Sequence, residues 1–185
     1  ADSLAVDFAA LISTDMDAAD SVSPAAVAPA QELSAQELDG DDELLFIFLE
    51  EAREVVESGL QALKALAEDA ANLSEQTTLR RAFHTLKGSS RMVGLDEFGE
   101  AGWAMEQMLN AWLAEQQPMP EPLQMLAQDA LKAFAAWAQD IENKQAQSWS
   151  ATPFRAAGDA MRLHGERAEV GFLPRRGERA GLAQP

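Results

Sequence analysis

A histidine in the middle of a basic segment is the residue of this chain best suited to do chemistry. His84 lies in Arg80-Arg-Ala-Phe-His-Thr-Leu-Lys-Gly-Ser-Ser-Arg91. No acidic residue occurs between Glu75 and Asp96, although the whole chain has 31 Asp and Glu, 14 Lys and Arg, and a formal net charge of −17. Cations around an exposed imidazole would stabilise a dianion on it, because phosphate oxygens accept charge-assisted hydrogen bonds from Lys and Arg. These residue types favour a histidine that accepts a phosphoryl group.

Helical periodicity places His84 on the exposed side of its element. The core arc of this helix is predicted to hold Leu79, Ala82, Phe83, Leu86, Ser90 and Val93. A second arc, roughly 130° away on the helical wheel, holds Arg80, His84, Lys87, Gly88 and Arg91, and we expect it to face solvent. Gly88 costs the helix about 1 kcal/mol relative to Ala, but its missing side chain leaves room for a partner to approach the imidazole. A single exposed histidine or a single basic face usually has no role. It is the combination of His84, Lys87, Gly88 and the local cations in an acidic chain that favours a function.

The sequence does not favour thiol chemistry, a metal site, nucleotide binding or hydrolysis. The absence of cysteine excludes disulfides, thiolate metal sites and a catalytic thiol. The only other histidine, His164, lacks a helical spacing to His84, so we expect no metal site. The segment 87–90, Lys-Gly-Ser-Ser, does not have the residue order of a P-loop, and no Ser, His and Asp set marks a hydrolase.

Four amphipathic helices must position these residues. Apolar residues recur every three or four positions over 41–66, 74–93, 96 to Pro118 and 121–144, and no strand pattern competes. Short connections make sequence neighbours adjacent, which predicts an all-α fold, an antiparallel up-down four-helix bundle with irregular N- and C-terminal flanks. Asn72 and Gly94 are predicted to mark the start and the end of the second helix.

The sequence predicts three segments. Residues 1–38 have the composition of an acidic Ala/Pro-rich linker, largely disordered, with a short helix over 4–12 as the alternative. Residues 39–147 form the bundle. Residues 148–185 are predicted to be an irregular C-terminal linker, although Trp149 and Phe154 could fold back onto the bundle. The chain has no initiator Met or targeting segment, and we interpret it as a fragment of a longer protein.

Charge and hydropathy restrict the partners and the location. A strongly acidic surface repels nucleic acids and anionic lipids. The longest apolar run, 44–49, is far shorter than the roughly 20 residues that span a bilayer. We therefore expect a protein that neither binds nucleic acid nor inserts into a membrane. The absence of cysteine allows a reducing compartment, so we expect a cytoplasmic location, and we expect the fragment to be monomeric.

The motif His84-Thr-Leu-Lys87-Gly88-Ser89 resembles that of histidine phosphotransfer (HPt) domains, in particular those of the CheA-type kinases of chemotaxis and of ChpA-like pilus motility. The resemblance covers roughly residues 41–145 and continues through Gly94 to Glu106, where the CheA-type domains carry a glutamate that hydrogen-bonds the active imidazole. It implies that Glu106 accepts Nδ1–H of His84, which leaves Nε2 as the nucleophile.

The resemblance also implies a role in a phosphorelay. His84 would take a phosphoryl group from the ATP-binding domain of a histidine kinase or from a receiver domain, and would pass it to a receiver aspartate of a response regulator. Lys87 would stabilise the phosphoryl charge. The partner would dock on Arg80, Arg81, Gly88, Ser89 and Arg91, although the long cation at Arg91 departs from the small residues that often flank the family's glycine.

We expect no cofactor in this chain, and Mg²⁺ to come with the kinase or receiver. The chain would act as a phosphoryl carrier whose parent is a histidine kinase. One alternative is a non-catalytic helical docking module in which His84 is inert. Another is an autokinase, although the sequence has no nucleotide-binding loop.

Overall fold

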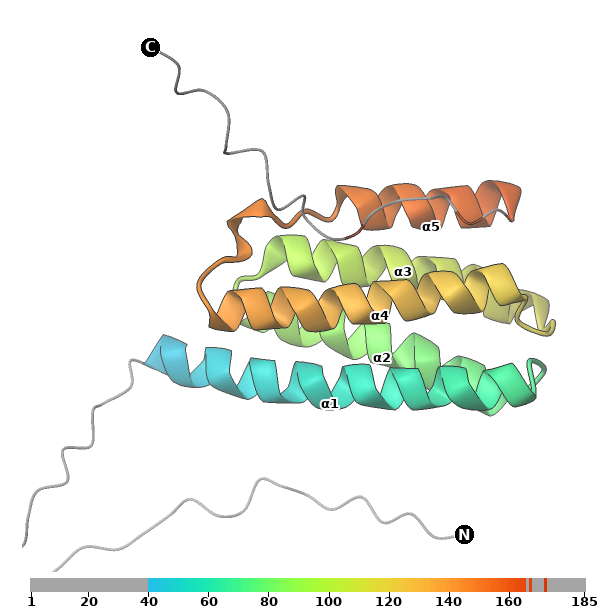
Figure 1. Cartoon of the computed structure of the whole chain (residues 1–185), viewed down its shortest axis with the longest axis horizontal. Coiled ribbons are helices and arrows are strands. Elements are labelled where there is room, and N and C mark those ends of the chain that lie inside the picture. The colour runs from blue at the N-terminus through green and yellow to red at the C-terminus, as the bar shows by residue number, and fades with distance from the viewer. Residues whose placement is uncertain (1–39, 166, 168–171, 173–185) are drawn as a thin grey trace, which may run out of the picture. The chain divides into compact units, whose positions relative to one another are not determined.

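The chain folds into a bundle of helices. The computed structural model describes residues 40–165, 167 and 172, and these residues contain no β-strand. The helices are α1 (Gly40–Glu68), α2 (Leu73–Met92), α3 (Asp96–Glu115), α4 (Glu121–Glu142) and α5 (Thr152–His164), with a 3-10 turn over Ala146–Ser148. Helices α1 to α4 run antiparallel to their sequence neighbours (Figure 1), which confirms the predicted all-α bundle. The predicted linker over 1–38 and the alternative helix over 4–12 lie outside the described residues.

Local signals set the ends of α2, the helix that carries His84. At its start, Oδ1 of Asn72 accepts a hydrogen bond from the backbone N–H of Glu75 at 3.2 Å. At its end, Gly94 adopts φ +73°, a left-handed conformation that costs glycine nothing. The N–H of Leu95 then donates to the carbonyl of Ser90 at 2.9 Å. Both ends follow the predicted capping pattern.

The first four helices surround one apolar core. Helix α1 packs against α2 and α4, and α2 packs against α3. Phe98 of α3 lies at the centre, with its ring centroid 5.3 Å from that of Phe48 on α1 and 4.8 Å from that of Phe134 on α4. Leu44 belongs to the apolar pattern of residues 41–66 but is exposed, because α1 has 29 residues against 20 in α2 and its first turns extend beyond the end of α2. None of the helices in the described part is long and apolar enough to span a membrane.

A fifth helix covers the bundle where the sequence predicted an irregular linker from residue 148, so that prediction is wrong for Thr152–His164. Helix α5 packs mainly against α3 (Figure 1). Its buried residues, Phe154, Ala157, Gly158 and Met161, keep the spacing of one helical face. A β-carbon at Gly158 would lie 3.3 Å from the carbonyl oxygen of Ala104, so the missing side chain lets α5 come close to α3.

The connection from α4 to α5 is fixed by polar and aromatic contacts. Trp149 stacks on Trp137 with ring centroids 5.1 Å apart, and its Nε1–H donates to Oδ2 of Asp140 at 2.8 Å. The N–H of Ala151 donates to Oε2 of Glu97 at 2.7 Å. These contacts place Phe154 against the core, 5.0 Å from Phe134 by ring centroids. The segment after the fourth helix is therefore part of the folded unit.

Replacing Phe154 with Ala tests this assignment. Phe154 is fully buried, and we expect Phe154→Ala to lower the free energy of unfolding by about 3 kcal/mol, the cost of truncating a core aromatic side chain. Urea unfolding followed by circular dichroism measures the change. Leu163→Ala is the control on the same helix, because Leu163 is 73% exposed. Equal stability of the two variants would mean that α5 does not belong to the core.

Candidate functional site

The site forms where α3 comes unusually close to α2. A β-carbon at Gly102 would lie 3.1 Å from the backbone nitrogen of Lys87, and one at Gly99 would lie 3.0 Å from Cγ of Arg91. Two glycines one turn apart on the same face thus allow the α3 backbone to pack directly on α2. The next residue on this face of α3 is Glu106.

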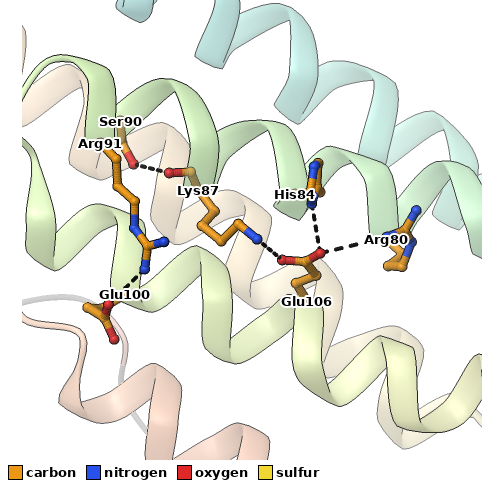
Figure 2. Close-up of polar contacts among 7 residues, drawn as sticks. All are labelled: Arg80, His84, Lys87, Ser90, Arg91, Glu100 and Glu106. Carbon is orange, nitrogen blue, oxygen red and sulfur yellow. Dashed lines mark hydrogen bonds and ion pairs between the residues drawn. The ribbon is translucent and has the colours of Figure 1, made fainter.

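The carboxylate of Glu106 joins three side chains of α2 (Figure 2). Its side chain is 5% exposed, and Oε1 lies 2.8 Å from Nδ1 of His84. Oε2 accepts a hydrogen bond from Nζ of Lys87 at 2.7 Å. Nη1 of Arg80 lies 3.7 Å from Oε1, within ion-pair distance. A buried carboxylate is stable only with such partners.

The electrostatics of Glu106 determine the state of the imidazole. Burial raises the pKa of Glu106, but the hydrogen bonds from Lys87 and His84 outweigh burial and hold this pKa below its usual value. An ionised carboxylate can only accept hydrogen bonds, so Nδ1 of His84 must donate. In the neutral ring Nε2 then carries the lone pair, and with it the nucleophilic electrons.

His84 presents that nitrogen to solvent. Its side chain is 57% exposed, whereas those of Lys87 and Arg80 are 18% and 26% exposed. The predicted solvent-facing arc is therefore wrong for Lys87 and Arg80, which pack against α3. The reason is the close approach at the glycines, which brings part of that arc into the interface between the two helices.

Of the residues predicted to dock a partner, some are open to solvent and others already have contacts within the bundle. Gly88 and Arg81 are exposed, and a β-carbon at Gly88 would have no neighbour within 4 Å. Ser89 is half-buried, and its hydroxyl donates to the carbonyl of Thr85. Arg91 extends to α3, where its Nη2 donates to Oε1 of Glu100 at 2.9 Å (Figure 2). The open surface next to His84 is thus formed mainly by Gly88 and Arg81.

Sequence reasoning missed the α3 residues that shape the site. The spacing Gly99-x-x-Gly102 inside a helix was a signal for a close helix contact, because glycine is unfavourable there without a packing reason. Glu100, the partner of Arg91, had no separate signal. The described residues include no group of three or more His, Cys, Asp and Glu side chains that could hold a metal ion. His164 lies exposed at the end of α5.

A comparison with protein families adds to this geometry. The family model described as "Hpt domain" matches residues 43–147, a range that includes both His84 and Glu106. No curated protein and no solved structure gives a significant match.

The lowered pKa of Glu106 gives a prediction for stability against pH. The folded-state pKa lies below the usual value of 4.5, so the ionised carboxylate stabilises the fold above that pH and loses this effect as the pH falls through the folded-state pKa. At neutral pH we expect Glu106→Gln to be less stable than the wild type by about 2 kcal/mol, since Lys87 loses its charged partner.

Urea unfolding at a series of pH values from neutral to acid measures this difference. The stability curves of the wild type and Glu106→Gln should converge below pH 4.5. A difference that stays constant across the series would contradict an ionised, stabilising Glu106.

Proposed function

Since the chain belongs to the Hpt domain family, whose domains carry out histidine phosphotransfer in two-component systems, we propose that it accepts a phosphoryl group on Nε2 of His84 and passes it to the aspartate of a receiver domain. The observation that carries this proposal is the 2.8 Å contact between Nδ1 of His84 and Glu106. It leaves Nε2 unprotonated on an exposed ring, which is what a nucleophile toward phosphorus requires.

Charge around the ring supports the same reaction. In the forward step the Nε2 lone pair forms a bond to phosphorus, and the bond from phosphorus to the donor oxygen breaks. The ring gains positive charge, and Glu106 stabilises it through Nδ1–H. Lys87 uses one N–H on Glu106, and its other two can neutralise phosphoryl oxygens. The transfer to the receiver aspartate is the reverse of this step.

The remaining components would come with the partners. Transfer from ATP or to a receiver aspartate uses a divalent cation to neutralise charge, and we assign Mg²⁺ to the receiver or to the ATP-binding domain of the kinase. The open surface at Gly88 lets a receiver bring its aspartate to Nε2, and Arg80, Arg81, Ser89 and Arg91 complete the surface on which it docks. The glutamate on the imidazole supports the CheA type, in the chemotaxis or pilus-motility branch, and hence a cytoplasmic module of a histidine kinase.

Labelling of His84 tests the proposal. Incubation with a phosphorylated receiver or a CheA-type kinase should give a phosphoprotein that is labile in acid and stable in alkali. His84→Gln should abolish the label. His164→Gln is the matched control, because His164 is exposed at the end of α5 and should have no effect. Full labelling of His84→Gln would refute the assignment. Binding of the receiver without any label would favour a docking module in its place.

The orienting role of Glu106 has its own test. We expect Glu106→Ala to slow phosphorylation of His84 by about tenfold or more, as for loss of a group that orients a catalytic base. Nitrogen-15 NMR of the imidazole should show Nδ1 as the protonated nitrogen in the wild type and a mixture of tautomers in the variant. Glu115→Ala, at the exposed end of α3, is the control. An unchanged tautomer in Glu106→Ala would show that Glu106 does not orient the ring.

A further inference from the structure

We propose that Arg81 contacts the phosphoryl group on His84 directly and, together with Lys87, holds it from two sides. This inference rests on the proposed function and gives Arg81 a role toward the phosphoryl group itself, in addition to its place on the docking surface.

The basic residues of α2 differ in what already neutralises them. Lys87 and Arg80 lie on the carboxylate of Glu106, at 2.7 Å and 3.7 Å. Arg91 is paired with Glu100 on α3. Among the described residues, Arg81 has no hydrogen-bond or ion-pair partner for its side chain. Its guanidinium is therefore the cation of this segment that is available in full to an incoming anion.

The helical register places Arg81 on the side of His84 away from Lys87. Lys87 follows His84 by three residues and Arg81 precedes it by three, so the two lie about 60° to either side of it around the helix. Lys87 is on the side of α3, where Nδ1 is bound, and Arg81 is on the open side.

The reach of the two side chains is also suitable. Side chains three residues apart on a helix have β-carbons about 5–6 Å apart. Both side chains lean toward the N-terminus and so keep about this spacing, which the long side chain of Arg81 can span. A phosphoryl group on Nε2 would therefore lie within reach of the guanidinium.

The charges balance once Arg81 is included. Phosphorylation places close to two negative charges on His84. Lys87, Arg80 and Glu106 together leave one positive charge, and Arg81 supplies a second. A planar guanidinium can donate two parallel hydrogen bonds to phosphoryl oxygens, so it suits this task better than an ammonium group does.

Chemical phosphorylation separates this role from partner docking. With phosphoramidate as the donor, the bond from phosphorus to nitrogen of the donor breaks, ammonia leaves, and Nε2 of His84 forms the new bond. No receiver or kinase is present, so any effect of Arg81 must arise within the chain. Phosphorus-31 NMR follows both the rate of labelling and the pKa of the phosphoryl group.

We expect Arg81→Gln to slow labelling about threefold, the size of effect that an exposed ion pair provides. The pKa of the phosphoryl group should rise by about half a pH unit, because a nearby cation favours the dianion. Arg81→Lys should restore most of both effects. Arg155→Gln removes the same side chain from the exposed face of α5 and should match the wild type.

The possible results distinguish the two proposals. If the wild type is labelled on His84 but Arg81→Gln matches it in both rate and phosphoryl pKa, the role of Arg81 is overturned and the proposed function stands. If the wild type is not labelled on His84 at all, the proposed function itself fails. A slower rate with an unchanged phosphoryl pKa in both Arg81 variants would also overturn the contact, because it would point to a structural effect.

Discussion

The buried carboxylate of Glu106 is the interaction on which the rest of the site depends. A negative charge that is only 5% exposed is costly without partners, and here all three partners come from α2. They can reach it only at one register and one separation of the two helices, which Gly99 and Gly102 allow. The contact that orients the imidazole therefore also fixes how α2 and α3 pack, so the chemistry and the fold are stabilised by the same group.

This arrangement divides the imidazole into an inner and an outer half. Nδ1 contacts the buried carboxylate of Glu106, whereas the His84 side chain as a whole is 57% exposed and its neighbours Gly88 and Arg81 are also exposed. The basic segment 80–91 is a short region of positive charge in a chain whose net charge is −17. An acidic partner is repelled by most of the surface and attracted by this part, so long-range electrostatics favour its approach in the productive orientation.

Local signals were sufficient to predict the helix ends and the exposure of His84. The contact with Glu106 followed from the resemblance to a known family, since residues on different helices share no periodicity. The burial of Lys87 could not be predicted, because it depends on how closely α3 approaches. Helix α5 was missed for a related reason: thirteen residues form a marginal helix in isolation, and their stability comes from docking on the core.

The aromatic core continues past the point where the family match ends. The match stops at residue 147, but Trp149, Phe154 and Phe172 are buried with the residues of α3 and α4. The matched range is thus shorter than the part of this chain that folds around the core. Helix α5 packs mainly against α3, the helix that carries Glu106. Loss of the α5 contacts would therefore act first on α3, and would reach His84 through that helix.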